Sequence, residues 1–534
     1  MQDYIKNQLL AHINKGLVAA FFIAISANTS HPLAAQTSAS NTSASLPLLG
    51  DGSEMTSSAE RRLGDRIARE LYRDPDYIDD PVLSDYLQDI WQALLAAARQ
   101  RGDLTPELQE RFAWRVVLGR DRSVNAFALP GGYLGVHLGL MAVVSSRSEL
   151  ASVLGHELSH VTQRHIARLM TKNSQQAPWV IGAMILGALA ASKNADAGNA
   201  LIVGGQALSA QSQLNFSRDM EREADRIGFG VMTQAGFEAQ GFVSMFEKLQ
   251  QASRLNDSGA YPYLRSHPLT TERIADMQSR LPIGAASVGA KPLTATHAMM
   301  AARARVLSST GADAMRGWQA QAESSVLAGM TPAAQAGALY GAAMAASRVR
   351  DASLARQHLD RLLQVVANDS ESLTQTRWLA AEVALAAGDL PQPALLALSS
   401  SIGMAQTQSA HVRRPALMLQ TQIALQGGQA DVLNAVAQHL QTWVAVYPAD
   451  GLAWQGLASV QAALNRPLRA LRAEAESHVA QLDYAGALDR LKAAQTMLSS
   501  GSLATSNADH IDASIIDTRR RQIETLFREQ SLEG

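Results

Sequence analysis

Three short apolar segments in the first half of the chain predict a small β-sheet. Residues 115–118 (Arg-Val-Val-Leu) are typical of a buried strand, and residues 125–129 predict a second strand that ends at the Pro-Gly-Gly turn of residues 130–132. Residues 133–136 predict a third strand. An open edge of this sheet could pair with an extended substrate chain through the strand that holds Asn125, Ala126 and Phe127. Packing explains these strands equally well.

Two apolar segments follow the sheet. Residues 177–191 are rich in Gly and Ala and lie between Lys172 and Lys193, and residues 200–210 are a second weakly polar stretch. An apolar run of this length falls short of the roughly 20 residues that span a bilayer. We expect a packed helical hairpin between the segments around residues 160 and 221. The alternative is a lid-like element, or one that makes peripheral membrane contact through 177–191.

The carboxy-terminal half has the pattern of paired amphipathic helices. Residues 286–297 are small and polar and predict a linker, and residues 298–534 carry Ala at close-packing positions. Trp454 and Ala470 are 16 residues apart, as are Trp378 and Ala394. This is the spacing of the first-helix Trp and second-helix small residue in a tetratricopeptide repeat. We expect a solenoid of about four or more helical hairpins with a concave binding surface, and a generic helical bundle is the alternative.

The amino terminus predicts export. Lys6 and Lys15 precede an apolar run at residues 16–27, and the small residues before Gln36 offer a cleavage point, so residues 1–35 are expected to be a signal peptide. An uncleaved anchor is the alternative, although the apolar run is short for a span. Residues 36–57 are rich in Ser and Thr and predict a flexible linker. The expected location is the periplasm of a Gram-negative cell.

Length and composition set limits on the function. A chain of 534 residues can hold two or more domains, and its aromatic content of 5% with abundant Ala favours helices. The net charge of -2 gives no basic surface for nucleic acid, so no nucleic-acid partner is expected. The absence of cysteine excludes thiolate zinc sites and disulfides. The total lack of thiols also removes cysteine as a catalytic nucleophile.

The pentapeptide 156–160, His-Glu-Leu-Ser-His, carries the strongest chemical signal. At about 100° per residue, His156 and His160 share one face of a helix, and Glu157 lies about 60° around from His160. One helical turn therefore offers two metal ligands and a general base, which is the pattern of a zinc peptidase. A charged surface helix with two solvated histidines is the alternative.

A tetrahedral zinc site of this kind needs a third protein ligand and a position for water. Glu221 and Asp225 are four residues apart, so Glu221 can bind the metal while Asp225 accepts a hydrogen bond from a ligand imidazole. Glu223 points elsewhere on the same helix. The alternative is an exposed helix with local ion pairs. His165 is expected on the far face of the first helix, away from the metal.

Four sequence runs carry a resemblance to a known family. They are NAFALPGGYLGVHLGLM from residue 125, GHELSHVTQRH from residue 155, SRDMEREADRIGF from residue 217 and SHPLTTERI from residue 266. Together they resemble the M48 family of zinc metallopeptidases, of the gluzincin type. The export signal and helical repeats are similar to its periplasmic branch. The resemblance is specific over the protease half and loose over the repeats.

The resemblance implies a mainly α fold. An α+β gluzincin-type metalloprotease domain with a small β-sheet, at residues 58–285, would precede an all-α tetratricopeptide-repeat solenoid. It further implies that His156, His160 and Glu221 bind one Zn²⁺ per chain, that Glu157 polarises the attacking water, and that Asp225 lies behind a ligand. His267 and Arg273 match the family's HPxxxxR pattern and are expected to contact the substrate or the oxyanion. His267 can also approach the metal and close the site; a packing histidine before a proline is the alternative.

The implied function is periplasmic peptide hydrolysis. Zinc-activated water needs no Ser or Cys nucleophile, and Glu157 would take its proton and later protonate the leaving amine. In this branch the substrates are misfolded or stalled outer-membrane β-barrel proteins, whose assembly the protease also assists as a chaperone. The repeat domain would contact the barrel-assembly machinery. The alternative function is a non-proteolytic assembly scaffold that uses the repeat groove. An integral-membrane peptidase is rejected because the chain has no apolar span of about 20 residues.

Overall fold

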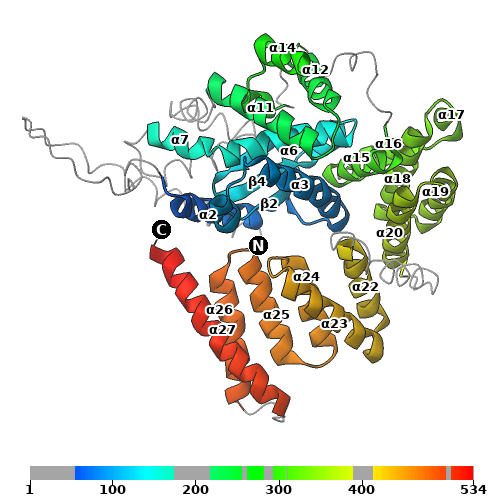
Figure 1. Cartoon of the computed structure of the whole chain (residues 1–534). Coiled ribbons are helices and arrows are strands. Elements are labelled where there is room, and N and C mark those ends of the chain that lie inside the picture. Colours follow the sequence, from blue (N-terminus) through cyan, green and yellow to red (C-terminus); the bar gives the residue numbers. More distant parts are fainter. Residues whose placement is uncertain are drawn as a thin grey trace, which may run out of the picture. The chain divides into compact units, whose positions relative to one another are not determined.

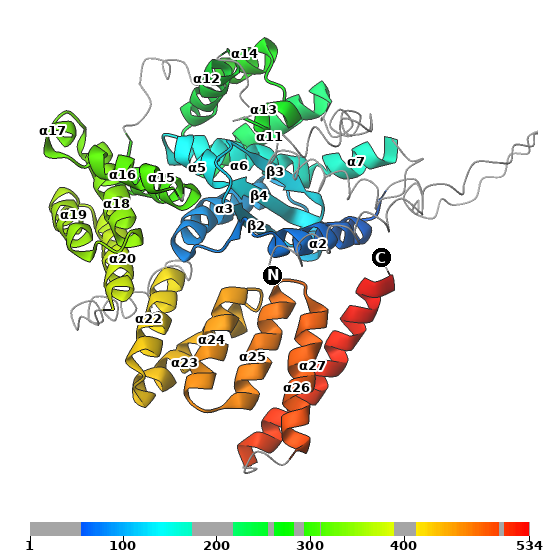
Figure 2. The same ribbon diagram turned by 180° about the vertical axis from the view of Figure 1, so that it is seen from behind.

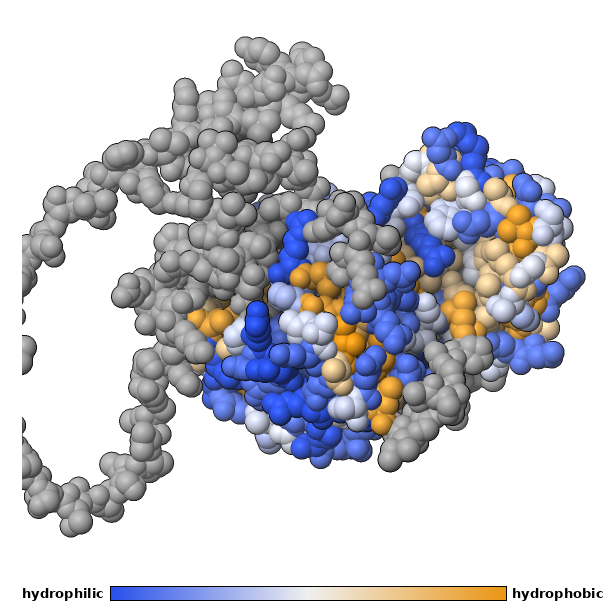
Figure 3. Space-filling view, turned by 90° about the horizontal axis from the view of Figure 1, so that it is seen from above, coloured by the Kyte–Doolittle hydropathy of each residue, from blue (hydrophilic) through white to orange (hydrophobic). Residues whose placement is uncertain are grey.

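The computed structural model describes residues 55–172, 217–254, 261–281, 293–309, 311–388, 413–500 and 507–532. The expected signal peptide, most of the Ser/Thr-rich linker, the apolar segments 177–191 and 200–210, and Ala394 lie outside the described residues. Among the helices that are described, none has the length and apolar character needed to cross a bilayer. Figure 3 shows one face of the molecule, on which hydrophobic residues are interspersed among hydrophilic ones.

A four-stranded mixed sheet lies within the amino-terminal half (Figure 1). Its strands in spatial order are β1 (Tyr77–Ile78), β2 (Arg115–Gly119), β4 (Tyr133–His137) and β3 (Ala126–Leu129). β2 runs parallel to β4, whereas β3 and β1 pair antiparallel with their neighbours. The three strands predicted from the apolar pattern are confirmed to within two residues at each end. The two-residue β1 leaves no such pattern.

The two faces of the sheet belong to different hydrophobic clusters, because side chains alternate along each strand. Val117 and Tyr133 pack with Leu63 and Ile67 of α2 (Ser57–Arg73). Leu134 and its neighbours on the other face pack with α3 (Pro81–Arg101) and α6 (Arg147–Thr162). The sheet is therefore covered by helices on both sides, and α6 carries the His-Glu-Leu-Ser-His segment.

Helix α2 lies unusually close to the turn η1 (Pro130–Gly132). A Cβ added at Gly64 would sit 2.0 Å from the carbonyl oxygen of Pro130, which is backbone and cannot move aside. We expect Gly64→Ala to lower the midpoint of urea unfolding and the free energy of unfolding by about 1–3 kcal/mol. The matched control is Gly317→Ala in the exposed helix α16 (Ala312–Gln321), where no atom lies within 4 Å and Ala should stabilise the helix slightly. Equal midpoints for the two variants would contradict the expected clash.

Seven further helices lie in the described part of the amino-terminal half. Helix α11 packs against α6, and α12 lies against both α6 and α14 (Figure 2). The seven are α4 (Pro106–Arg111), α5 (Leu138–Val143), α7 (His165–Lys172), α11 (Arg218–Gln234), α12 (Gln240–Arg254), α13 (Tyr263–Ser266) and α14 (Thr271–Ser279).

In the carboxy-terminal half, the regular structure of the described residues is all helical. Helices α22 to α27 lie side by side in chain order, as both ribbon views show (Figures 1 and 2). Helix α15 begins at Ala295, inside the range 286–297 that was expected to be a linker. The helices are α15 (Ala295–Ser308), α16, α17 (Ser324–Leu327), α18 (Pro332–Arg348), α19 (Ala352–Val365), α20 (Ser370–Ala387), α22 (Arg413–Gly427), α23 (Ala430–Val446), α24 (Gly451–Ala463), α25 (Pro467–Ala480), α26 (Tyr484–Ser499) and α27 (Asn507–Leu532).

Buried ion pairs join these helices to the amino-terminal half. Arg303 of α15 donates to both carboxylate oxygens of Asp80, the N-cap of α3, at 2.8 and 2.7 Å, and to Glu382 of α20 at 2.7 Å. Arg414 of α22 bridges Asp79 and Asp450, at 2.7 Å from an oxygen of each. The start of α3 is therefore a charged junction between the two halves.

Asp85 of α3 is a buried acid near this junction. Burial raises the pKa of Asp85 in α3 to about 8, and attraction by Arg414 opposes the rise only in part. An unfolded aspartate ionises near pH 4, so the folded chain binds more protons between about pH 4 and 8 and its stability falls as pH rises. We expect Asp85→Asn to raise the unfolding temperature at pH 8 and to change it little at pH 4. Asp313→Asn at an exposed position of α16 is the control. A pH-independent effect at Asp85 would contradict this linkage.

Candidate metal centre

Helix α6 begins and is positioned by local contacts that its sequence supplies. Ser146 caps it by accepting a hydrogen bond from the Glu149 amide at 3.1 Å. Where α6 crosses α11, a Cβ on Gly228 would sit 2.9 Å from the backbone of Gly155, so only glycine permits this approach. The close crossing brings residues 221 and 225 of α11 against the histidines of α6.

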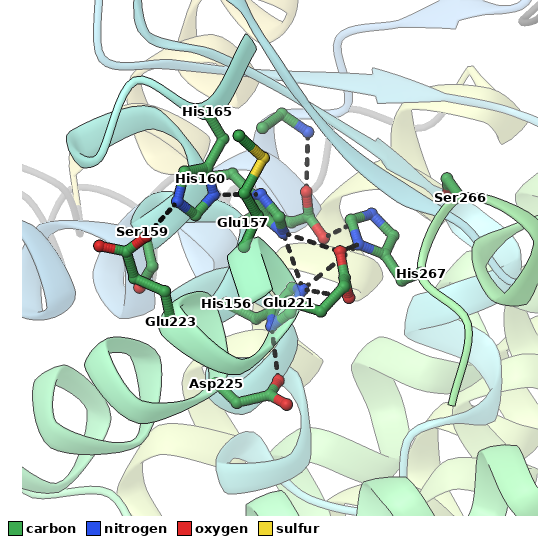
Figure 4. Close-up of polar contacts among 12 residues, drawn as sticks. His156, Glu157, Ser159, His160, His165, Glu221, Glu223, Asp225, Ser266 and His267 are labelled. Atoms are coloured by element: carbon green, nitrogen blue, oxygen red, sulfur yellow. Dashed lines mark hydrogen bonds and ion pairs between the residues drawn. The ribbon is translucent and has the colours of Figure 1, made fainter. Parts of the chain in front are cut away.

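Four buried side chains converge on one point (Figure 4). Each of His156, His160, Glu221 and His267 offers one ligand atom, and the four atoms lie within 4.8 Å of one another. The Nε2 atoms of His156 and His160 are 3.0 Å apart, and they lie 3.6 and 3.5 Å from oxygens of Glu221. The two histidines and the glutamate predicted as ligands are thus brought together, and His267 joins them.

This donor set fits a divalent metal ion. Burial lowers the pKa of His160 well below its usual range, and the other histidines add to the effect, so its ring is neutral and keeps a lone pair. Burial alone would raise the pKa of Glu221, but His267, His156 and Arg273 outweigh it and lower that pKa, so the carboxylate is charged. Neutral imidazoles and an ionised carboxylate are the ligands that zinc prefers.

Glu157 lies beside the cluster and is fully buried. Its Oε2 accepts a hydrogen bond from the Ala128 amide of β3 at 2.8 Å, and its Oε1 lies 3.4 Å from Nε2 of His267. Among the described residues, Oε1 has no hydrogen-bond donor. Burial raises the pKa of Glu157, although His267 and His156 lower it in part. A basic carboxylate held by one oxygen, with the other facing the cluster, suits proton transfer.

Asp225 and Arg273 lie behind the ligands. Asp225 Oδ1 is 2.9 Å from Nδ1 of His156, on the ring nitrogen opposite the cluster. Arg273 makes a two-pronged pair with Asp225 at 2.6 and 2.8 Å and lies 2.8 Å from Glu221 Oε2. These contacts lower the pKa of Asp225 despite its burial. Arg273 thus lies beside the centre in contact with two of its carboxylates, and its expected contact with the substrate or the oxyanion stays a prediction.

His267 is the C-cap residue of α13 and reaches the cluster from a separate element. Its Nδ1 lies 3.0 Å from Oε1 of Glu221 and 3.3 Å from Nε2 of His156, and its ring stacks on Tyr263 with centroids 4.7 Å apart. The two nearby glutamates raise its pKa although burial alone would lower it. The side chain therefore points into the cluster in the described conformation.

The register of β3 shows which backbone groups face the centre. Asn125 O accepts from His137 N at 3.0 Å, and residues alternate along an antiparallel pair, so the backbone groups of Asn125 and Phe127 point toward β4. The backbone groups of Ala126 and Ala128 point the other way, and the Ala128 amide is the one that binds Glu157. Of the three residues predicted to pair with substrate, Ala126 alone directs its backbone away from β4, toward the edge of the sheet that the described residues form.

Sequence reasoning missed two neighbours of the centre, His165 and Glu223. His165 was expected on the far face of a continuous helix, and this is wrong because α6 ends at Thr162 and Arg164 adopts a left-handed conformation (φ 52°). Nδ1 of His165 lies 2.8 Å from Nδ1 of His160, and its Nε2 lies 3.1 Å from Oε2 of Glu223. No Gly or Pro at residues 163–164 signals this break. His165 is not among the four clustered ligands, as predicted.

The comparisons with known proteins identify the domain around this centre. The model of peptidase family M48 matches residues 84–281, a range that holds β2 to β4, α6, α11 and His267. Residues 84–281 are a peptidase family M48 domain. These residues therefore have the sequence of a metallopeptidase domain. The structure confirms the mainly helical fold and the small sheet that the sequence predicted.

Several curated proteins are similar to this chain. The chain is 36% identical over 304 residues to the putative beta-barrel assembly-enhancing protease of Vibrio cholerae, covering 56% of this chain and 60% of that one. It is 28% identical over 521 residues to the beta-barrel assembly-enhancing protease of Escherichia coli, covering 94% and 96% of the two chains. It is also 33% identical over 164 residues to the mitochondrial metalloendopeptidase OMA1 of Arabidopsis thaliana, covering 31% of each.

Proposed function

We propose that the chain is a zinc-dependent endopeptidase that binds one Zn²⁺ through His156, His160 and Glu221. The observation that carries the proposal is the convergence of these three side chains in one buried cluster, with Glu157 beside it. Surface ion pairing does not require four buried ligand atoms within 4.8 Å of one another. Two imidazoles and one carboxylate leave a position for water, as in other hydrolytic zinc sites.

Each residue of the centre has its own role in the proposed reaction. A zinc ion held there would polarise the scissile carbonyl and lower the pKa of its bound water toward about 7. Glu157 then accepts the proton of the attacking water and delivers it to the leaving amine. Asp225 orients the His156 ring, and Arg273 keeps Asp225 and Glu221 charged. His267 covers the cluster at rest and contacts the reacting group when the substrate enters.

The substrate would bind as an extended strand along the outer edge of β3. The N–H and C=O of Ala126 point to that edge, next to the Ala128 amide that holds Glu157. Pairing with Ala126 would therefore align a peptide bond with Glu157, while Asn125 and Phe127 support the strand from the β4 side. This mode reads the backbone and not particular side chains, which suits cleavage of unfolded chains.

The name of the Escherichia coli relative, which matches almost the whole chain, supports a particular client. We infer that this chain degrades misfolded or stalled outer-membrane β-barrel proteins and assists their assembly in the periplasm. We assign residues 58–285 to the protease and 298–534 to tetratricopeptide-like repeats. The repeats would contact clients or the barrel-assembly machinery.

Cleavage of a defined client tests this function. Purified chain should cut a urea-unfolded outer-membrane β-barrel protein, and o-phenanthroline should stop the reaction. The same barrel folded in detergent micelles is the control and should resist cleavage because its strands are already paired. If the unfolded barrel stays intact with zinc present while its folding yield rises, the scaffold function replaces the peptidase function.

A further inference from the structure

His160 is held from behind by a chain of two side chains. Nδ1 of His165 lies 2.8 Å from Nδ1 of His160, and Oε2 of Glu223 lies 3.1 Å from Nε2 of His165 (Figure 4). His165 is fully buried, and Glu223 lies nearer the surface with 30% of its side chain exposed. These two side chains therefore connect the protein surface, at Glu223, to the ring of His160 in the central cluster.

The hydrogen bonds among Glu223, His165 and His160 are mutually consistent in one arrangement of the ring protons. A neutral imidazole carries one N–H and one acceptor nitrogen, and a carboxylate only accepts. Glu223 must therefore accept from Nε2–H of His165, which leaves Nδ1 of His165 as an acceptor. That atom accepts from Nδ1–H of His160, 2.8 Å away, so the lone pair of His160 lies on Nε2, the atom that faces the cluster.

The two histidines of α6 are thus supported in different ways. His156 meets a carboxylate directly, since Asp225 Oδ1 lies 2.9 Å from its Nδ1. His160 reaches its carboxylate, Glu223, through the intervening ring of His165. A carboxylate behind a metal-binding imidazole fixes the orientation of the ring and raises its basicity. Both carboxylates come from helix α11, where Glu223 and Asp225 flank Ala224 in the sequence.

The bend between α6 and α7 allows His165 to contact both His160 and Glu223. On a continuous helix, His165 would lie about 140° around from His160, at about 100° per residue, and could not contact its ring. Arg164 instead adopts φ 52°, a conformation that disfavours residues with a side chain. Its guanidinium donates to the buried Glu60 of α2 at 2.8 Å and to the Met55 carbonyl. These contacts hold the bend and turn His165 back toward His160.

We propose that His165 and Glu223 are positioning residues that fix the tautomer and orientation of His160, so that its Nε2 is presented to the metal. The proposal rests on the proposed zinc site. Neither residue touches the metal or the substrate, and their effect is on how tightly the metal is held. Loss of such a support lowers metal affinity about 10–100-fold.

Glu223 gives the cleaner test because its side chain is partly exposed and its loss should leave the fold intact. Glu223→Ala should increase the zinc dissociation constant, measured by competition with a chromogenic chelator, by about 10-fold or more. Glu223→Gln retains an acceptor oxygen for His165 and should restore most of the affinity. The matched control is Arg168→Ala, which removes the 2.9 Å partner of Glu223 on the solvent side and should leave zinc affinity unchanged.

A second variant tests His165, which lies between Glu223 and His160. His165→Leu should weaken zinc binding at least as much as Glu223→Ala, and should change the visible absorption of the Co²⁺-loaded protein because the His160 ring reorients. His137→Leu replaces a buried histidine that bonds to Ser123 at 2.9 Å, away from the centre, and controls for general destabilisation.

The outcomes separate the two proposals. If wild-type protein binds no zinc, the proposed function fails. If wild type binds zinc and Glu223→Ala binds it equally well, the positioning role is wrong while the zinc site stands. A loss of affinity in Arg168→Ala as large as in Glu223→Ala would also overturn the positioning role, because it would show a nonspecific effect of this surface.

Discussion

Replacing Glu157 by Gln should lower the rate of peptide cleavage by about 10²- to 10⁴-fold, or below detection, while the protein keeps its zinc. The amide cannot accept the proton of the attacking water. It can still meet the Ala128 N–H through its carbonyl oxygen, so the contact that positions the side chain survives. The measurement is kcat on an unfolded barrel protein together with metal content for both proteins.

A control separates lost chemistry from lost structure. Glu238→Gln, at a half-buried position in the segment between α11 and α12, removes the same charge from the M48 domain and should leave kcat unchanged. If Glu157→Gln cleaves at the wild-type rate with its zinc bound, Glu157 is not the proton acceptor. Loss of zinc in this variant would contradict the assignment of Glu157 to proton transfer alone.

Replacing Arg273 by Met should reduce the free energy of unfolding by about 3–5 kcal/mol, because it leaves buried Asp225 and Glu221 without their guanidinium partner. Met replaces the aliphatic part of the Arg side chain, so the loss is mainly that of the charged guanidinium. The comparison should use metal-free protein, in which no bound cation compensates the two carboxylates. Urea unfolding of both proteins gives the difference.

The pH dependence of this difference follows from the lowered pKa of Asp225. Stability from a carboxylate whose folded pKa is depressed is present above its unfolded pKa, near 4, and is lost as pH falls through the folded value. The gap between wild type and Arg273→Met should therefore narrow below about pH 4. Arg280→Met removes a half-exposed pair with Asp276 and should change stability by less than about 1 kcal/mol. Equal effects of the two variants would show that burial is not the cause.

Much of the centre could be predicted because its pattern is local. His156, Glu157 and His160 lie within one turn of α6, and Glu221 and Asp225 within one turn of α11, so helical spacing alone groups each set correctly. Strands β2, β3 and β4 could be predicted from short apolar runs. The family resemblance then connected the two helices and added His267 and Arg273.

The features that escaped prediction depend on tertiary contacts. The bend at Arg164 is held by Glu60, which is 104 residues away in the chain, and no local turn residue announces it. His165 was therefore placed on the wrong side of α6. The ion pair of Arg273 with Asp225 likewise depends on how α14 packs beside α11, which local spacing does not determine. The backbone direction of Asn125 and Phe127 follows from the pairing of β3 with β4, which spacing along the chain does not determine.

The measurement that tests the account most directly is a zinc titration of the metal-free protein. Cleavage of an unfolded outer-membrane β-barrel protein should appear with added Zn²⁺ and reach its maximum at one zinc per chain, and Glu221→Ala should not recover activity under the same conditions. Cleavage by the metal-free protein at the rate of the zinc-loaded protein would contradict the central claim that this chain is a zinc peptidase.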